Sequence, residues 1–169
     1  MKLKQPKVFK KYFNAFPDAR GFLTALDSEQ LEKKLQVNFK YQLVSLSKKK
    51  STFRGFHYQK KPNAQNKIVI VHRGKILDFA VKIDSPVSSQ VKSFELSAGD
   101  VIAIPHDYAH GFLSLTDNVI IQYLLDNKFS ARSYSGLNAN SFIKEKFSNR
   151  KIIISMKDKS LKDKILIDD

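Results

Sequence analysis

The sequence predicts an all-β chain folded as an antiparallel barrel or a double-sheet jelly roll, with one short helix near the N-terminus. Short β-rich segments recur along most of the chain, and turn-forming residues separate them. Only one segment carries clear helix signals, whereas a parallel α/β sheet needs a helix between successive strands. The pattern therefore favours antiparallel strands that close on one another or stack as two sheets.

The helix is expected over residues 27–35. Asp27 can cap its N-terminus, and Gln30 is placed to return the hydrogen bond. Directly afterwards, residues 35–43 (LQVNFKYQL) alternate between apolar and polar side chains. This alternation predicts a strand with one buried face.

The remaining strands follow at short intervals. They are expected over residues 52–59, 68–71, 76–83, 93–96, 101–104, 111–115, 119–125 and 152–155. Turn signals separate several of them, namely Arg73-Gly74, which is expected to close a hairpin, Asp84-Ser85-Pro86, Ala98-Gly99-Asp100 and Thr116-Asp117-Asn118. The charged tail from residue 144 holds one apolar run, so it is expected to dock as a strand and then fray.

Length and composition predict one folded domain over residues 1–169. The chain is 42% hydrophobic and 11% aromatic, which is enough for a core. It has no cysteine, so disulfides, thiolate nucleophiles and zinc-thiolate sites are excluded. No apolar stretch reaches the roughly 18 residues that cross a bilayer, and the N-terminus lacks the apolar part of a secretory signal. We expect a cytoplasmic protein with no membrane contact.

The net charge of +14 raises the question of nucleic-acid binding. Residues 1–50 carry a net charge of +8 and residues 144–169 a net charge of +3, so the two ends carry most of the excess. However, no helix has a one-sided basic stripe, there is no zinc-finger spacing, and the aromatic residues follow strand alternation. Nucleic acid is therefore not an expected partner. Two interpretations of the charge stay open: a solvated surface, or attraction for a polyanion such as a nucleoside diphosphate.

Two segments place histidines on neighbouring strands. In FRGFHYQ (53–59), alternation directs either Arg54, Phe56 and Tyr58 or Phe53, Gly55, His57 and Gln59 inward, and the pattern does not choose between the two sets. The segment GDVIAIPHDYAHGF (99–112) puts His110 at the start of a strand. His57 and His110 can therefore share a pocket with an arginine, a glutamine and Lys67. His72 and His106 are expected on the surface or in turns.

These segments resemble one enzyme family. FRGFHYQ, NAQNKIVIVHRGKILDFAVKI (63–83), IPHDYAHGF (104–112) and SMKDKS (155–160) occur in this order, with DARGF (18–22) before them. Together they resemble the dTDP-4-dehydrorhamnose 3,5-epimerases over about residues 14–160. The resemblance implies a cupin-type double-stranded jelly roll, usually a homodimer. It also implies an isomerase that needs no cofactor and acts on a nucleoside-diphosphate 4-keto sugar for surface polysaccharide biosynthesis.

The resemblance also assigns roles to individual residues. His57 would be the base that removes a proton from the carbon beside the ketone, Lys67 the cation that stabilises the enolate oxygen, and Asp158 the partner of the second ring nitrogen of His57. Each has a simpler interpretation as a buried structural histidine, a surface lysine or a surface aspartate. Further residues would bind the substrate: Arg20 and Arg54 match positions that hold the nucleotide and diphosphate. Gln59 and His110 would line the pocket, and Phe129 is also expected among the substrate-binding residues.

The chain departs from the family at the second proton-transfer residue. The segment YLLDNKFSA (123–131) puts Phe129 where the family has a tyrosine, and a phenyl ring has no proton to give. Water, Tyr134 or Tyr123 would have to take over, and inversion of one carbon rather than two is an alternative. Further departures at Ala25 and residues 42–45 and 137–140 leave the nucleotide and the sugar open.

Three alternative functions remain at this stage. A ketoisomerase would use His57 or His110 to move the carbonyl of the same substrate class. A metal-binding cupin is disfavoured because the paired HxH motif and the glutamate of a first-row metal site are missing, so no metal is expected. A non-catalytic sugar-nucleotide binder would explain both Phe129 and the positive charge.

Overall fold

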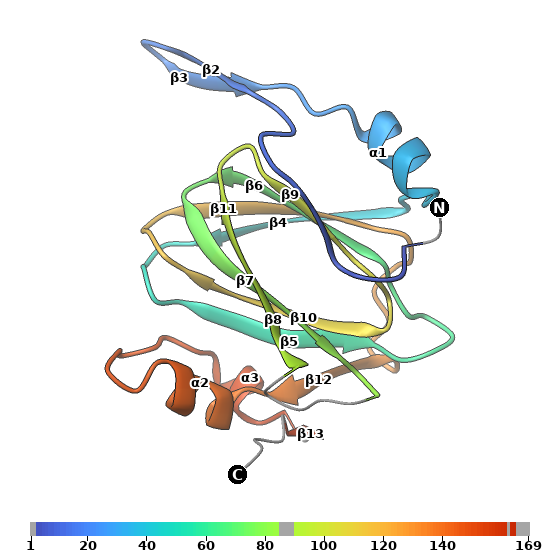
Figure 1. The fold of residues 1–169 in the computed structure, drawn as a ribbon, viewed down its shortest axis with the longest axis vertical. Helices are drawn as coiled ribbons and strands as arrows, with labels where there is room; N and C mark the ends of the chain where they lie inside the picture. The colour runs from blue at the N-terminus through green and yellow to red at the C-terminus, as the bar shows by residue number, and fades with distance from the viewer. Residues whose placement is uncertain (1–2, 85–89, 162, 165–169) are drawn as a thin grey trace.

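The structure, a computed structural model, describes residues 3–84, 90–161, 163 and 164. It confirms the predicted fold class, because two stacked, mostly antiparallel sheets form the body of the molecule (Figure 1). The five-stranded sheet has the order β1 (Lys7–Phe9), β9 (Val101–Ile104), β6 (Lys67–Arg73), β11 (Val119–Leu125) and β4 (Tyr41–Ser47). The six-stranded sheet has the order β13 (Asp163–Lys164), β12 (Tyr134–Asn138), β5 (Phe53–Gln59), β10 (Tyr108–Ser114), β7 (Lys75–Lys82) and β8 (Lys92–Ser97). Neighbouring strands are antiparallel except for β12 and β13.

The tight turns connect the two sheets. Arg73-Gly74 joins β6 to β7, which lie in different sheets, so the predicted hairpin is wrong. The turns at residues 98–100 and 116–118 likewise lead from β8 to β9 and from β10 to β11. This crossing is characteristic of a jelly roll. Of the predicted turn at residues 84–86, Ser85 and Pro86 lie outside the described residues.

Apolar side chains are buried on both faces of the sheets. One core cluster fills the space between the sheets and includes Val69, Ile102 and Phe112. A second covers the outer face of the five-stranded sheet beneath α1 (Ser28–Leu35), and a third covers the outer face of the six-stranded sheet beneath α2 (Asn140–Lys146). Because the central strands are buried on both faces, they are nearly continuous apolar runs rather than alternating ones.

The predicted N-terminal helix is α1. Asp27 caps it by accepting a hydrogen bond from the backbone N–H of Gln30, while the Gln30 side chain bonds to Tyr12 instead of returning to the cap. Gln36 adopts a left-handed conformation that ends the helix. The strand predicted from residue 35 begins only at Tyr41, because the preceding apolar side chains pack under α1.

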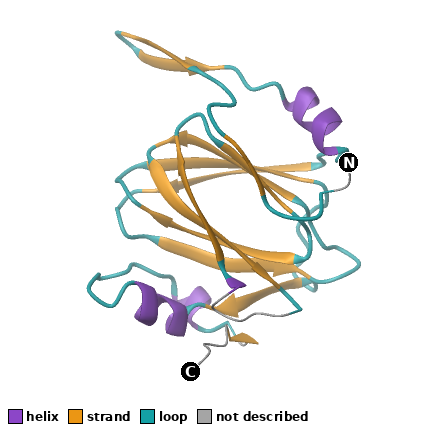
Figure 2. Cartoon of the chain, in the orientation of Figure 1, coloured by secondary structure: helices purple, strands orange, loops and turns teal. Residues whose placement is uncertain are grey.

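Three features near the chain ends were not fully predicted. The helices α2 and α3 (Met156–Lys159) add to the expected single helix (Figure 2). The apolar run of the tail docks through one isolated bridge, between Ile153 and Thr52, and not as a full strand. The hairpin formed by β2 (Ala15–Asp18) and β3 (Gly21–Thr24), here called the β2–β3 arm, projects from the two sheets (Figure 1). Within the described ranges, no helix is long and apolar enough to span a membrane.

Candidate active site

His57 lies on β5, where the regular alternation of the strand is broken. Phe53 and Phe56 both belong to the core cluster on the outer face of the six-stranded sheet, while Arg54 and His57 both line a cavity between the sheets. The pairing of β5 with β10 shifts register between His110 and Phe112, which explains this three-residue spacing. Neither inward set expected from alternation is therefore correct.

A glycine contact brings the two histidine-bearing strands together. Gly55 has a φ of +126°, and a Cβ at this position would lie 2.5 Å from the Cα of Gly111 and 2.7 Å from the carbonyl oxygen of His110. Any larger residue would push β5 and β10 apart. The contact holds His57 directly opposite His110 in the sheet.

Asp158 stands behind His57, as the resemblance implies. Its Oδ1 lies 2.8 Å from Nε2 of His57, and its Oδ2 accepts a hydrogen bond from the backbone N–H of Gly55 at 3.3 Å. Ser155 caps α3 by accepting from the backbone N–H of Asp158, which fixes the carboxylate at this position. Burial acts to raise the pKa of Asp158, but the hydrogen bonds from His57 and Gly55 outweigh it and hold that pKa below its usual value. Nδ1 of His57 has no hydrogen-bond partner among the described residues.

A second histidine–carboxylate pair lies deeper in the cavity wall. Nε2 of His110 is 2.7 Å from Oδ2 of Asp78, and both side chains are buried. Burial raises the pKa of Asp78, although the charges of His110 and Lys67 oppose the shift. The sequence analysis did not identify Asp78 as a candidate. It is the one acidic residue in the mostly apolar strand KILDFAVK, and a carboxylate in such a strand indicates a buried residue with a partner.

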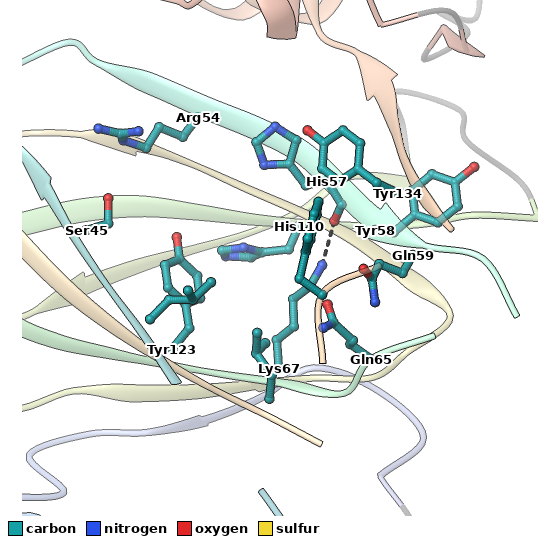
Figure 3. A pocket seen from close by; sticks show the side chains of 13 residues that line it. Ser45, Arg54, His57, Tyr58, Gln59, Gln65, Lys67, His110, Tyr123 and Tyr134 are labelled. Carbon is teal, nitrogen blue, oxygen red and sulfur yellow. Dashed lines mark hydrogen bonds between the residues drawn. The ribbon is translucent and has the colours of Figure 1, made fainter. Parts of the chain in front are cut away.

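Lys67 enters the cavity from the facing sheet. Its Nζ donates a hydrogen bond to the carbonyl oxygen of His57 at 2.7 Å (Figure 3). Burial lowers the pKa of Lys67 to about 8, against the attraction of Asp78. The ammonium group is therefore mostly charged at neutral pH and is a cation inside a largely apolar cavity.

The cavity has a volume of about 290 Å³ and opens to solvent. Residues from both sheets, from the loop between β5 and β6 and from the loop after β11 line it: Leu43, Ser45, Arg54, His57, Tyr58, Gln59, Gln65, Lys67, His110, Tyr123, Leu125, Phe129 and Tyr134. Figure 3 shows the polar side chains converging on it. Of the residues singled out from the sequence, the cavity thus gathers His57, Lys67, Arg54, Gln59, His110 and Phe129, with Asp158 behind His57.

The two candidate arginines have different positions. Arg54 is exposed at the rim of the cavity, where it donates hydrogen bonds to Oγ of Ser47 and the carbonyl oxygen of Leu46. Arg20 lies in the β2–β3 arm, and its side chain is 90% exposed and paired with Asp18. Within this chain Arg20 does not line the cavity.

Gln59 holds the loop that carries Phe129. Its Nε2 donates to the carbonyl oxygens of Asn63 and Lys128, and its Oε1 accepts from the backbone N–H of Ser130. Phe129 is therefore fixed at the cavity; the residue is 54% exposed, and its ring lies 5.9 Å from the ring of Tyr134. Tyr134, on β12, also lies 5.7 Å from the ring of His57, and burial together with the charge of Asp158 raises its pKa to about 12.

The other two histidines lie outside the cavity. His72 bonds to the side chain of Gln122, and the backbone N–H of His106 bonds to Asn66. In the part of the chain that the structure describes, no three histidine, aspartate or glutamate side chains are grouped as a metal site requires.

Comparison with known proteins gives concordant matches. The family profile described as dTDP-4-dehydrorhamnose 3,5-epimerase matches residues 2–164. The chain is 34% identical to the dTDP-4-dehydrorhamnose 3,5-epimerase of Sinorhizobium fredii over 72% of its own length and 66% of that protein. It is 35% identical to the Salmonella typhimurium enzyme of the same name, over 76% of this chain and 70% of that one.

A solved structure extends the match. The dTDP-4-dehydrorhamnose 3,5-epimerase of Bacillus anthracis, crystallised with TDP and PPi, superposes with a TM-score of 0.78 at 32% identity, over 96% of both chains. The interpretation of the sequence as a sugar-nucleotide epimerase, and so an isomerase, is confirmed at the level of the family. The chain belongs to the dTDP-4-dehydrorhamnose 3,5-epimerase family.

Proposed function

We propose that this chain inverts C3, C5 or both in a dTDP-linked 4-keto sugar by proton removal and return. The observation that carries the proposal is the position of His57, which lines the cavity with the Asp158 carboxylate on one ring nitrogen and, among the described residues, no hydrogen-bond partner on the other. A carboxylate on Nε2 fixes the tautomer that leaves Nδ1 unprotonated, so this nitrogen can accept a proton.

The ketone makes the reaction accessible to a histidine. Removing a proton from the neighbouring carbon gives an enolate, whose negative charge falls on the carbonyl oxygen. Lys67 supplies a cation in the same cavity, where charge interactions are stronger than in water. His57 takes the proton, Lys67 stabilises the oxygen, and a proton returned to the opposite face completes the inversion.

The nucleotide is expected at the cavity rim. Arg54 is exposed there, and its planar guanidinium suits paired phosphate oxygens. The Bacillus anthracis relative, which was solved with TDP bound, supports a thymidine diphosphate as the carrier. We infer that Arg20 reaches a diphosphate only in an assembly, because its own chain keeps it away from the cavity.

A homodimer would provide such an assembly. Large apolar side chains are exposed on the β2–β3 arm at Phe16, Phe22 and Leu23, of which Leu23 is 71% exposed. A second exposed group, Leu43, Val44 and Leu46, lies on the edge strand β4. Two copies that cover these surfaces would remove them from water. Light scattering coupled to gel filtration tests this, and a monomer at micromolar concentration would contradict it.

Product analysis tests the function itself. The protein is incubated with a dTDP-linked 4-keto-6-deoxyhexose, and the products are identified by proton NMR. An epimerase keeps the ketone at C4 and gives a diastereomer, in which the protons at C3 and C5 have new chemical shifts and inversion at C3 changes the coupling between H2 and H3. A carbonyl at C3 would identify a ketoisomerase, and an unchanged substrate that is nevertheless bound would identify a binding protein.

A further inference from the structure

The hydrogen bond to Asp158 fixes only one point of the His57 ring. It holds Nε2 at 2.8 Å, and the ring can still turn about that contact. The side chain of His57 is 34% exposed, so packing does not enclose it on every side. For proton transfer, the lone pair of Nδ1 must point at the carbon that loses its proton, and this direction changes with the plane of the ring. A second contact, along the ring itself, is therefore needed.

Tyr134 makes a contact of this kind. Its ring centroid lies 5.7 Å from that of His57, with 42° between the two planes, and Figure 3 shows the two rings side by side. The backbone of Tyr134 is held on β12, where it pairs with Gln59 and its N–H donates to the carbonyl oxygen of Ser130. Among the described residues the Tyr134 hydroxyl has no hydrogen-bond partner, so the ring makes the contact to His57 without a hydrogen bond.

Lys157 lies over the ring of Tyr134. Its Nζ is 4.2 Å from the ring centroid, which is within the range of a cation–π interaction. Among the described residues this ammonium group has no acidic or hydrogen-bond partner that would draw it away. Lys157 directly precedes Asp158 in α3. One short helix therefore supplies both the carboxylate that bonds to His57 and the cation that lies on the neighbouring ring.

A second cavity gives the His57 ring room to move. It has a volume of about 420 Å³, and His57, Tyr134, Lys157 and Asp158 are among the residues that line it. The helix α3 is fastened beside this cavity, because Nδ2 of Asn138 on β12 donates to two carbonyl oxygens at the C-terminal end of the helix, at 2.8 and 3.1 Å. The helix is thus fixed, whereas His57 has open space beside it. Without the Tyr134 ring, the imidazole could turn toward that space.

We propose that Tyr134 is a positioning residue, whose ring holds the plane of the His57 imidazole so that Nδ1 points into the substrate cavity, and that Lys157 holds the Tyr134 ring. Asp158 fixes one atom of the imidazole, and Tyr134 fixes its plane. Tyr134 exchanges no proton in this role. The role depends on the function proposed above, because the direction of Nδ1 matters only if this nitrogen takes a proton from the substrate.

Two substitutions separate the ring from its hydroxyl. Tyr134→Phe keeps the ring, so kcat should stay within about three-fold of the wild type. Tyr134→Leu removes the ring, and because misplacing a reacting group by about 1 Å can cost about 100-fold, kcat should fall by about 10- to 100-fold. KM should change by less than about three-fold, since the direction of Nδ1 affects the transition state more than substrate binding. Tyr12→Leu makes the same replacement outside the cavity, where Tyr12 bonds to Gln30 of α1, and should behave as the wild type.

Lys157 provides an independent test through a double-mutant cycle. Lys157→Gln removes the cation and should lower kcat by about 2- to 30-fold, the range of a cation–π contact. Lys157→Arg should restore kcat, because a guanidinium also stacks on an aromatic ring. In the Tyr134→Leu background, Lys157→Gln should have no further effect, since its contact to His57 passes through the ring. An equal effect in both backgrounds would mean that Lys157 acts directly, for example on the substrate, and would overturn its role.

Three results would overturn the role of Tyr134 while leaving the epimerase intact: wild-type kcat in Tyr134→Leu, a raised KM with unchanged kcat, or equal losses in Tyr134→Phe and Tyr134→Leu. The second would make Tyr134 a wall for the substrate, and the third would assign the role to the hydroxyl. A wild type that neither inverts the substrate nor takes up deuterium would contradict the proposed function itself. Urea unfolding shows whether each variant is folded. If Tyr134→Leu is not, the exposed Lys157 decides: loss in Lys157→Gln that Lys157→Arg restores supports the role, and wild-type kcat in Lys157→Gln overturns it.

Discussion

Replacing Asp158 with asparagine is expected to damage catalysis more than replacing it with alanine. The reason lies in the two hydrogen bonds of the carboxylate. Oδ2 faces the backbone N–H of Gly55, which requires an acceptor, and Oδ1 faces Nε2 of His57. An asparagine would place its oxygen toward Gly55 and its NH2 toward His57. Nε2 would then have to accept, and the proton would move to Nδ1, the nitrogen that must act as base.

The magnitude follows from these bonds. Loss of a hydrogen bond to a charged group costs about 1.5–3 kcal/mol, which corresponds to about 10- to 150-fold in kcat and is the expectation for Asp158→Ala. In Asp158→Asn, the hydrogen bonds of the amide to Gly55 and His57 also stabilise the tautomer with the proton on Nδ1. Removing that proton raises the activation free energy by a further amount of about 1–3 kcal/mol. The total loss for Asp158→Asn is then about 2.5–6 kcal/mol, or about 70- to 25,000-fold.

Initial rates of epimerisation at saturating substrate provide the assay, with urea unfolding of both variants as the control for folding. If Asp158→Asn is as active as Asp158→Ala or more so, the tautomer argument is wrong. If either variant lies within three-fold of the wild type, Asp158 does not position His57 at all.

Three further predictions concern the pH profile, the strand contact and the missing tyrosine. Lys67 loses its charge as the pH rises through about 8, so the kcat of the wild type should fall above that pH. Lys67→Arg should keep its remaining activity to higher pH, because a guanidinium stays charged. The same fall of kcat at alkaline pH in both proteins would contradict the role of Lys67 as the cation for the enolate oxygen. Gly55→Ala should lower the free energy of unfolding by about 2–4 kcal/mol because its Cβ would collide with Gly111, and a loss under 0.5 kcal/mol in urea would refute the close contact. Phe129→Tyr adds a hydroxyl at the cavity and should increase the fraction of product inverted at both carbons by NMR; an unchanged ratio would argue against its equivalence to the family tyrosine.

Much of the fold could be predicted from local sequence. The strands from β5 to β11 follow from apolar runs and the turn residues between them, and α1 follows from its cap. The assignment of the strands to the two sheets could not be predicted from these local patterns. Arg73-Gly74 has the composition of a hairpin turn, but its two strands separate because each has a partner far away in sequence, β11 for β6 and β10 for β7. The strand β12 was missed because Tyr134–Asn138 is short and contains a glycine, and pairing with β5 holds it in place.

The candidate site was partly predictable for a similar reason. Ordered motifs identified His57, Lys67 and Asp158, and the structure brings them together although more than 100 residues separate Gly55 from Asp158. Alternation failed on β5 because the irregular pairing opposite His110 depends on Gly111, a residue of another strand. The position of Arg20 also escaped prediction, since sequence motifs do not reveal that the β2–β3 arm leaves the body of its own chain.

The most direct test of His57 as the base is deuterium uptake at C3 and C5 of a dTDP-linked 4-keto-6-deoxyhexose in heavy water. The matched pair is His57→Asn and His106→Asn, because His106 lies outside the cavity. Wild type and His106→Asn should incorporate deuterium at similar rates, and His57→Asn should incorporate none above the rate without protein. Undiminished uptake in His57→Asn would contradict the account.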